Sequence, residues 1–330
     1  MTQTKILRWG ILGPGSISTK FATGLQAAEN GQLVAVGSRN ADRATAFAAQ
    51  FGATNIHTSY ESLAADPDVD AIYIGAPHTY HKEHAILCMR AGKHVLCEKP
   101  FALNAQQAAE MIAVAQESGV LLMEAMWSRF LPTLVKTREL IAEGAIGEVR
   151  KLYADFGFRM GTVLPDHRLF NPDLGGGALL DVGIYPLSLG SMLFGTPSRI
   201  SSMANLGSTG VDEETAFILG YEKGQMALCS TAIQLNTPHQ AHILGTDGSI
   251  EIHNPWWASD RLTLKVGQTE TTYHLPFKGN GYTHEAEEVA NCVAAGKTES
   301  AVMPLAETLE IMKTMDQLRT QWGLSYPREG

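Results

Sequence analysis

The sequence predicts an α/β N-terminal domain followed by an α+β C-terminal domain with a large, mostly antiparallel open sheet. Its 330 residues are more than one ordinary domain holds. Up to about residue 126, short apolar runs alternate with helical patterns, as in a parallel sheet with crossover helices. After Trp127 the pattern changes to strands with period-2 alternation and few helices between them, which is typical of an antiparallel sheet.

Six apolar runs in the N-terminal half predict six parallel strands with five helices between them. We expect Asp42 and Asn104 to cap two of these helices and Gly92 to end a third. The predicted strands cover residues 7–13, 33–38, 55–58, 70–76, 94–98 and 120–125, and the helices cover residues 17–28, 42–51, 60–65, 80–91 and 104–119.

The C-terminal half predicts eight strands and four helices. The domain boundary is expected near Met126, giving domains 1–126 and 127–330, because the pattern changes there without a Pro/Ser-rich linker. The predicted strands cover residues 149–158, 200–204, 214–221, 225–234, 240–245, 249–253, 261–266 and 270–275, and the helices cover residues 132–143, 178–194, 283–295 and 305–323.

Composition and charge exclude several classes of partner. The formal net charge of −9 argues against nucleic acid or an anionic membrane as the main partner, because both require a basic face. No apolar run is expected to reach the ~18 residues that span a bilayer, and no signal-peptide pattern starts the sequence. The four cysteines form no CxxC pair and are expected to be buried, reduced thiols. A cytoplasmic protein is therefore expected.

A glycine-rich turn follows the first predicted strand and opens the first helix. Gly13 permits a tight turn, and Gly15 lets the backbone approach a pyrophosphate. The helix N-terminus at Ser16 and Ile17 offers free N–H groups and a partial positive charge to phosphates. Ser18 stands where such turns often have a third glycine, and it is small enough for close helix–strand packing. The turn predicts a Rossmann dinucleotide-binding domain.

The end of the second strand indicates which dinucleotide binds. NAD enzymes usually have an acidic residue there for the ribose 2′-hydroxyl, whereas this strand ends in Ser38 and Arg39. Arg39 can stack on the adenine and pair with a 2′-phosphate, and Ser38 can donate a hydrogen bond. The predicted cofactor is NADP (NADPH). The alternative is that Arg39 is an ordinary surface residue.

Two charged residues, Glu98 and Lys99, end the fifth predicted strand. Ligands of open α/β sheets bind at the carboxyl ends of the strands, and a charged pair there is costly unless it faces a site. Lys99 could transfer a proton to or from a substrate oxygen, and Glu98 could hold the nicotinamide ribose. Pro100 fixes the following turn. The alternative is a structural ion pair.

A second candidate site element lies in the C-terminal half, where three consecutive glycines at 175–177 precede Asp181 and Tyr185. Asp181 and Tyr185 are i and i+4 on one predicted helix, so their side chains share a face. A carboxylate and a phenol among apolar neighbours suit recognition of a substrate hydroxyl and proton transfer. A structural hydrogen bond between them is the alternative.

Together these motifs resemble the glucose–fructose oxidoreductase/inositol dehydrogenase (Gfo/Idh/MocA) family, over essentially the whole chain. Many members have histidine where this chain has Tyr185, and that departure resembles the dimeric dihydrodiol dehydrogenase branch, whose members also act as NADP-dependent D-xylose dehydrogenases. The matching stretches are residues 9–11, the turn at Gly13, Glu98-Lys99-Pro100, residues 123–130 and residues 175–181.

The resemblance implies roles for individual residues. Lys99 and Tyr185 would be the catalytic pair, assisted by Asp181, and these three would contact the substrate. The spacing of His78, His81 and His84 does not suit a zinc site, and His84 is expected on a helix surface. The remaining implied cofactor contacts are Pro77, His78, His81, Glu98, Lys99, Trp127 and Arg129, and the remaining substrate contacts are Trp256 and Phe277.

The expected activity is reversible hydride transfer between NADP and a CH–OH carbon of a small-molecule sugar or cyclic diol. One alternative is the reduction of a keto-sugar such as 1,5-anhydrofructose, and another is a non-catalytic NADP-binding sensor. The resemblance also implies a homodimer formed through the C-terminal sheet, with a tetramer as the alternative. No metal is expected.

Overall fold

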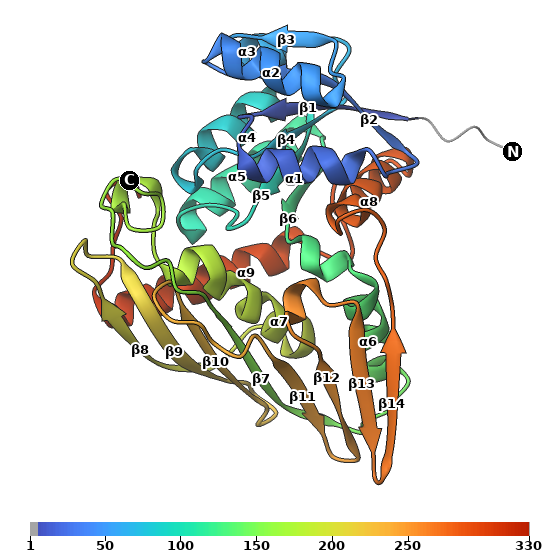
Figure 1. The fold of residues 1–330 in the computed structure, drawn as a ribbon, viewed down its shortest axis with the longest axis vertical. Helices are drawn as coiled ribbons and strands as arrows, with labels where there is room; N and C mark the ends of the chain where they lie inside the picture. The colour runs from blue at the N-terminus through green and yellow to red at the C-terminus, as the bar shows by residue number, and fades with distance from the viewer. Residues whose placement is uncertain (1–5, 330) are drawn as a thin grey trace, which may run out of the picture. The chain divides into compact units, whose positions relative to one another are not determined.

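The computed structural model describes residues 6–329, and the chain divides into two compact units (Figure 1). The first unit comprises the chain up to Ala102 together with Gln106–Trp127 and Lys278–Thr308. The second comprises Leu103–Ala105, Ser128–Phe277 and the chain from Leu309 onward. The single boundary expected near Met126 did not anticipate that residues 278–308 return to the first unit.

The first unit is built on a six-stranded sheet in the order β3-β2-β1-β4-β5-β6, in which every pair is parallel. This order confirms the predicted Rossmann domain. Its strands are β1 (Leu7–Leu12), β2 (Gly31–Gly37), β3 (Asn55–His57), β4 (Ala71–Ile74), β5 (His94–Glu98) and β6 (Leu122–Ala125), and its helices are α1 (Ser16–Leu25), α2 (Ala41–Phe51), α3 (Tyr60–Ala64), α4 (His81–Arg90), α5 (Ala105–Ser118) and α8 (Tyr282–Ala294).

An aromatic core fixes α1 against the sheet. Phe21 of α1 stacks on Tyr73 of β4 with ring centroids 3.9 Å apart, and Trp9 of β1 meets Phe21 edge-on at 5.2 Å. Helix α8 packs on α1 at Gly24, where a Cβ atom would lie 2.9 Å from the backbone nitrogen of Thr283. This close approach explains why the segment after residue 277 belongs to the first unit.

One prediction about a helix end is wrong and another is confirmed. Asn40, not Asp42, caps α2: its side chain accepts a hydrogen bond from the N–H of Arg43 at 2.9 Å, while Asp42 lies in the first turn. The helix begins at Ala41, so its cap lies two residues before the predicted one. Gly92 follows α4 with φ of +78°, in the left-handed region expected of a helix-ending glycine.

The second unit is built on an eight-stranded sheet in the order β14-β13-β12-β11-β7-β10-β9-β8. All neighbours are antiparallel except β7 and β10, so the predicted mostly antiparallel sheet is confirmed. The strands are β7 (Val149–Gly157), β8 (Arg199–Leu206), β9 (Asp212–Gly220), β10 (Met226–Ala232), β11 (Ala241–Gly245), β12 (Gly248–Ile252), β13 (Arg261–Val266) and β14 (Thr269–His274).

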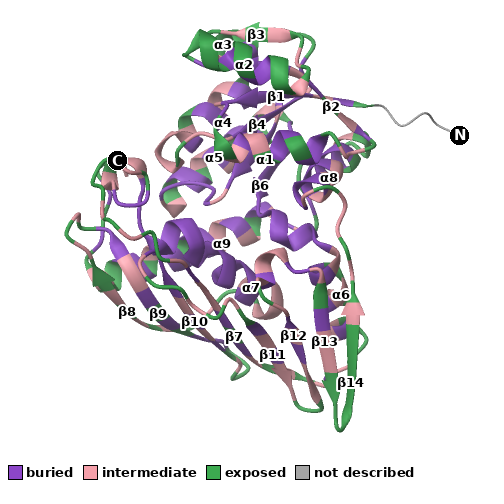
Figure 2. Cartoon of the chain, in the orientation of Figure 1, coloured by how far each residue is buried: buried purple, intermediate pink, exposed green. Residues whose placement is uncertain are grey.

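One face of this sheet is covered by helices and the other is open. Along β9, Phe217 and Leu219 are buried while Ala216 and Ile218 are exposed, and Figure 2 shows similar alternation on neighbouring strands. The remaining elements include α6 (Pro132–Ala142), α7 (Ile184–Phe194), α9 (Leu305–Trp322, shared between the units) and the single-turn helices Trp127–Phe130, Pro172–Leu174 and Trp256–Ala258.

The run Pro172–Phe194 is long and apolar enough to cross a membrane by length and composition alone, contrary to the expectation that no run would be. Of its most apolar window, 78% is buried inside the protein. Leu187 and Leu189 of this run are buried residues of α7, which packs on β7 and β10. This arrangement is typical of a core helix.

Candidate functional site

The glycine-rich turn has the geometry of a phosphate cradle. Gly13 has φ of +84°, which favours glycine, and a Cβ atom on Gly15 would meet no atom within 4 Å. Gly15 is the N-cap of α1, and its first turn contains no acidic residue and no side-chain cap. The space beside this helix N-terminus is therefore open, as a bound phosphate requires.

Ser18 bonds back to the start of the turn. Its Oγ donates a hydrogen bond to the carbonyl oxygen of Gly13 at 2.7 Å. A Cβ atom on Gly75 would collide with the Oγ of Ser18. The turn after β1 thus packs directly against the turn after β4. A serine at the third motif position is compatible with the close packing that a glycine usually permits there.

The end of β2 presents Arg39 over an aromatic stack. The guanidinium carbon of Arg39 lies 5.8 Å from the ring centroid of Tyr60, and Arg39 is exposed. The Tyr60 ring meets His84 at 4.7 Å between centroids, and His84 stacks on Tyr80 at 5.7 Å. The predicted 2′-phosphate ligand is therefore an exposed cation supported by three aromatic rings.

The expectation that His84 lies on a helix surface is wrong. His84 is 7% exposed, and its Nδ1 accepts no hydrogen bond from any described residue. Burial lowers the pKa of His84 to about 4, so the ring is neutral. It is buried because α3 and the turn before α4 supply Tyr60 and Tyr80, contacts that the pattern of α4 alone does not reveal.

Glu98 and Lys99 occupy the carboxyl end of β5 as predicted. The Tyr73 hydroxyl donates to Oε1 of Glu98 at 2.5 Å, and the Lys99 backbone N–H donates to Oε2 at 3.1 Å. Both oxygens of the buried Glu98 are thus held by its own unit. The Lys99–Pro100 peptide is cis.

A second buried carboxyl group, Glu285 of α8, lies near this one. Glu285 is fully buried, and neither of its oxygens accepts a hydrogen bond from a described residue. Burial, and then the charge of Glu98, raise the pKa of Glu285 well above its usual range. Burial of this carboxyl group therefore favours its neutral, protonated form. No sequence pattern pointed to Glu285.

The loop after β4 contains Pro77, His78 and His81. Pro77 is exposed and His78 is half-buried in a short helical turn, His78–Tyr80. His81 is fully buried, and its two ring nitrogens contact the carbonyl oxygens of Ala76 and Pro100, each at 2.9 Å. His81 therefore ties together the loops that follow β4 and β5.

In the second unit, Asp181 and Tyr185 lie on one continuous helical segment, but not on one regular α-helix. Leu179–Gly183 is a π-helical turn that leads into α7, so Asp181 and Tyr185 are separated by the π–α junction. Single π-turns are frequent at functional sites. Asp181 is buried and accepts a hydrogen bond from Nη1 of Arg168 at 2.8 Å. Sequence reasoning missed Arg168.

An aromatic cluster surrounds Tyr185. Phe156 of β7 stacks on Trp257 with centroids 3.3 Å apart, and the Tyr185 ring lies 5.2 Å from Phe156 and 6.4 Å from Trp257. His239 meets Trp257 edge-on at 4.7 Å. Its φ of +60° is unusual for a non-glycine residue, and such strain is concentrated at functional sites. The sequence did not single out any of these three neighbours as a site residue.

The other implied contact residues have structural partners. Trp256 is 1% exposed and its indole N–H donates to the Asp155 carbonyl, whereas Phe277 is half-buried. The Arg129 guanidinium donates to Oγ and the carbonyl of Ser188, and Trp127 stacks on Tyr282 at 4.7 Å.

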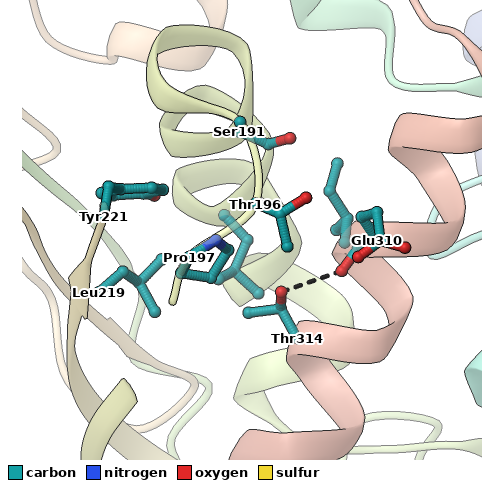
Figure 3. Close-up of a pocket in the computed structure, with 10 residues that line it drawn as sticks. Ser191, Thr196, Pro197, Leu219, Tyr221, Glu310 and Thr314 are labelled. Atoms are coloured by element: carbon teal, nitrogen blue, oxygen red, sulfur yellow. Dashed lines mark hydrogen bonds between the residues drawn. The ribbon is translucent and has the colours of Figure 1, made fainter. Parts of the chain in front are cut away.

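The second unit also contains a small pocket (Figure 3). Its volume of about 10 Å³ is close to that of one water molecule, and none of the predicted site residues lines it. Tyr221, Thr196 and Glu310 are among its lining residues. It is too small to hold a sugar or a diol.

The two units match two family models. Residues 7–126 match the model described as an oxidoreductase family with an NAD-binding Rossmann fold, and residues 134–251 match the GFO/IDH/MocA C-terminal domain. The chain therefore belongs to the Gfo/Idh/MocA oxidoreductase family, as its motifs indicated. The predicted fold class and an NAD(P)-dependent oxidoreductase activity are confirmed.

Individual relatives are similar over nearly their whole length. The chain is 38% identical over 330 residues to the trans-1,2-dihydrobenzene-1,2-diol dehydrogenase of Xenopus tropicalis, covering 97% of this chain and 99% of the relative. The human enzyme of the same name is 37% identical, covering 98% and 99%. An aldose-aldose oxidoreductase from Caulobacter crescentus, solved with glycerol, is 25% identical with a TM-score of 0.88, covering 97% and 99%. A 3-ketoreductase from Actinomadura kijaniata, solved with NADP and TDP-benzene, is 25% identical with a TM-score of 0.85, covering 96% and 98%.

Proposed function

We propose that this protein transfers a hydride between NADP and a CH–OH carbon of a sugar or cyclic diol. The observation that carries the proposal is the arrangement of Asp181 and Tyr185 on one buried segment, with Asp181 held by Arg168 and Tyr185 beside the rings of Phe156 and Trp257. Hydrogen-bonding groups next to aromatic rings suit a ligand with hydroxyl groups and apolar ring faces. Relatives named for diol and aldose substrates support this class of substrate.

The cofactor proposal rests on the first unit. The open helix N-terminus at Gly15 fits a pyrophosphate, and the absence of an acid at Ser38 and Arg39 favours NADP over NAD. Arg39 would pair with the 2′-phosphate, and Glu98 would hold the nicotinamide ribose. When bound, the nicotinamide accepts or supplies the hydride.

The proposed proton transfer uses this chain's own side chains. In the oxidative direction, Tyr185 accepts the proton of the substrate hydroxyl while its own phenolic proton passes through Lys99 to solvent. Asp181 orients the substrate by accepting a hydrogen bond from a neighbouring hydroxyl group. These roles rest on the match of the three residues to the family's motifs.

The test is turnover by two conservative variants. Tyr185→Phe and Lys99→Met should each lower kcat by orders of magnitude while the Kd for NADP, measured by fluorescence titration, changes little. Tyr273→Phe, a half-buried tyrosine on the edge strand β14, is the control and should be as active as the wild type. Full activity in either site variant would remove the assignment.

A panel of candidate substrates, assayed with both cofactors, decides the substrate and the direction of the reaction. D-xylose and other aldoses, polyols and trans-dihydrodiols are tested with NADP and NAD, and keto-sugars such as 1,5-anhydrofructose with NADPH. The similarity to a 3-ketoreductase favours including the reductive direction. Tight NADP binding without turnover over the whole panel would favour a sensor instead.

We also propose a cytoplasmic homodimer that associates through the open sheet face. Met203, Ile218 and Tyr153 are 79%, 46% and 40% exposed on strands β8, β9 and β7. They lie around a shallow hollow of about 650 Å³. A second copy of the chain would bury these side chains. Sedimentation should show a dimer that Ile218→Asp converts to a monomer, and a monomeric wild type would contradict the proposal. The four cysteines are free and buried, which supports a reducing compartment.

A further inference from the structure

One buried carboxylate supports the start of the segment that carries Asp181 and Tyr185. Asp212 begins β9, is fully buried, and its Oδ2 accepts a hydrogen bond from the N–H of Leu179 at 2.6 Å. Its Oδ1 accepts no hydrogen bond from any described residue. The N-terminal end of a helix has free N–H groups and a partial positive charge, so a carboxylate there stabilises it.

The three consecutive glycines provide room for this carboxylate. Gly177 has φ of +120°, and a Cβ atom on it would collide with Oδ1 of Asp212. A Cβ atom on Gly176 would lie 2.7 Å from the carbonyl oxygen of Leu169 and 2.8 Å from that of Arg168. Both positions therefore require glycine. The glycine motif lets the backbone approach Asp212, which lies 35 positions after Gly177 in the sequence.

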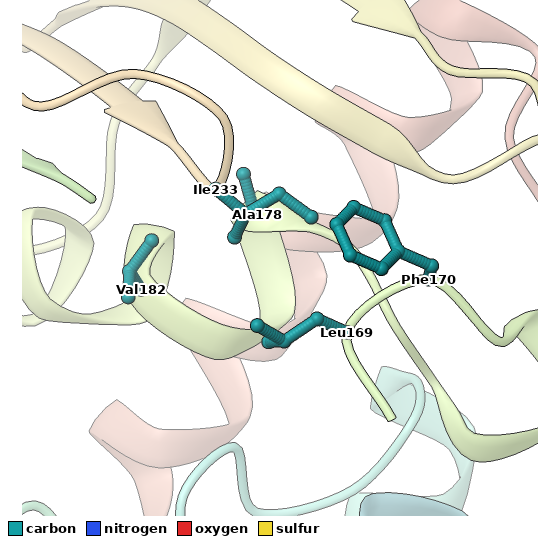
Figure 4. Close-up of a cluster of buried hydrophobic side chains, with 5 residues drawn as sticks. All are labelled: Leu169, Phe170, Ala178, Val182 and Ile233. Carbon is teal, nitrogen blue, oxygen red and sulfur yellow. The ribbon is translucent and has the colours of Figure 1, made fainter. Parts of the chain in front are cut away.

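An apolar cluster packs against the same segment (Figure 4). Phe156 packs against this cluster and also lies 5.2 Å from the Tyr185 ring. A shift of the segment start would therefore reach Tyr185 both along the helix and through Phe156. The cluster consists of Leu169, Phe170, Ala178, Val182 and Ile233.

The charged and titratable side chains near Asp212 belong to the C-terminal part of the chain. Arg319 of α9 is the nearby cation, but it pairs with Asp316 and Glu329. The Tyr326 hydroxyl donates to the carbonyl of Gly176 at 2.6 Å and stays neutral. The backbone N–H groups of the segment are thus the direct partners of Asp212.

Resting on the function proposed above, we infer that Asp212 is a positioning residue that holds the segment bearing Asp181 and Tyr185, and that it does so most firmly when ionised. The ionised form makes the stronger, charge-assisted hydrogen bond to Leu179. Burial raises the pKa of Asp212 to about 7, while the Leu179 N–H opposes this shift. The segment is therefore held more tightly above pH 7 than below it.

The activity test uses Asp212→Asn, which keeps the shape of the side chain and removes its charge. We expect kcat to fall by about tenfold to a hundredfold, because a displacement of about 1 Å costs about 10²-fold. The acidic limb of the pH profile of kcat near pH 7 should disappear, and the Kd for NADP should stay within twofold. Asp173→Asn, an exposed acid in the turn before the glycines, is the matched control. A variant with the wild-type kcat and pH profile would overturn the inference.

A second measurement needs neither activity nor a variant. Amide hydrogen exchange of residues 178–183 in the wild-type protein, corrected for intrinsic exchange rates, should show greater protection at pH 8 than at pH 6. Equal protection at both values would overturn the inference even if Asp212→Asn failed to fold. If the wild type turned over no substrate, the proposed function would fail, while the exchange result would still decide the role of Asp212 in holding the segment.

Discussion

The guanidinium carbon of Arg39 lies 5.8 Å from the centroid of the Tyr60 ring. Arg39 follows β2, and Tyr60 begins α3, so the contact joins two elements that both lie at the carboxyl edge of the parallel sheet. An exposed arginine otherwise samples many rotamers, and stacking on a ring reduces that freedom. The ring presents the cation near where a cofactor's 2′-phosphate is expected.

Removing the cation should change the choice of cofactor. Arg39→Ala is expected to lower kcat/KM with NADP by about 10- to 100-fold, since a hydrogen bond to a charged group contributes about 1.5–3 kcal/mol. The value with NAD should change little. Arg43→Ala, an exposed arginine on α2, serves as control. Steady-state kinetics with both cofactors decides, and an unchanged NADP/NAD ratio would refute the role of Arg39.

The ring that supports Arg39 should have a smaller effect in the same direction. Tyr60→Leu is expected to raise the KM for NADP by about two- to fivefold, because an exposed cation–π contact contributes about 0.5–1 kcal/mol. Tyr60→Phe keeps the ring and should behave like the wild type. The idea fails if Tyr60→Phe and Tyr60→Leu give the same KM.

The buried carboxyl group of Glu285 should make stability depend on pH. Its folded pKa is raised, so the folded protein binds this proton more tightly than the unfolded chain does, whose glutamate pKa is about 4.3. Between these two values the folded state loses stability as the pH rises. The melting temperature of Glu285→Gln minus that of the wild type should therefore be larger at pH 8 than at pH 5.

Scanning calorimetry at both pH values measures this difference. Glu83→Gln, an exposed glutamate on α4, is the control and should show no such gain. A constant difference between Glu285→Gln and the wild type at pH 5 and pH 8 would show that Glu285 is ionised in the folded protein.

Two adjacent tryptophans are expected to have different roles, one in substrate binding and the other in core packing. Trp257 is half-buried and stacks on Phe156 beside Tyr185, whereas Trp256 is 1% exposed. Trp257→Leu should raise the KM for substrate several-fold with little change in melting temperature. Trp256→Leu should instead lower the melting temperature, because it leaves a cavity and an unpaired Asp155 carbonyl. The opposite pattern would return the substrate role to Trp256.

Much of the fold was predictable because its signals are local. Alternating apolar runs and helical periodicity placed all six strands of the parallel sheet and all eight of the open sheet, with ends that shift by a few residues. The turn from Gly13 to Ser18 and the Glu98–Lys99 pair were recognisable because strand ends and turns constrain the residues that occupy them.

The sequence by itself therefore determined the two sheets, the glycine turn and the positions of Arg39, Lys99 and Tyr185 along the chain. Only the tertiary structure decided that His84 is buried behind Tyr60, that Glu285 is a buried acid near Glu98, and that Asp212 meets Gly177. The physical reason is that burial and pKa depend on which distant segments pack together. A local pattern records how one segment is amphipathic, and does not record what covers it.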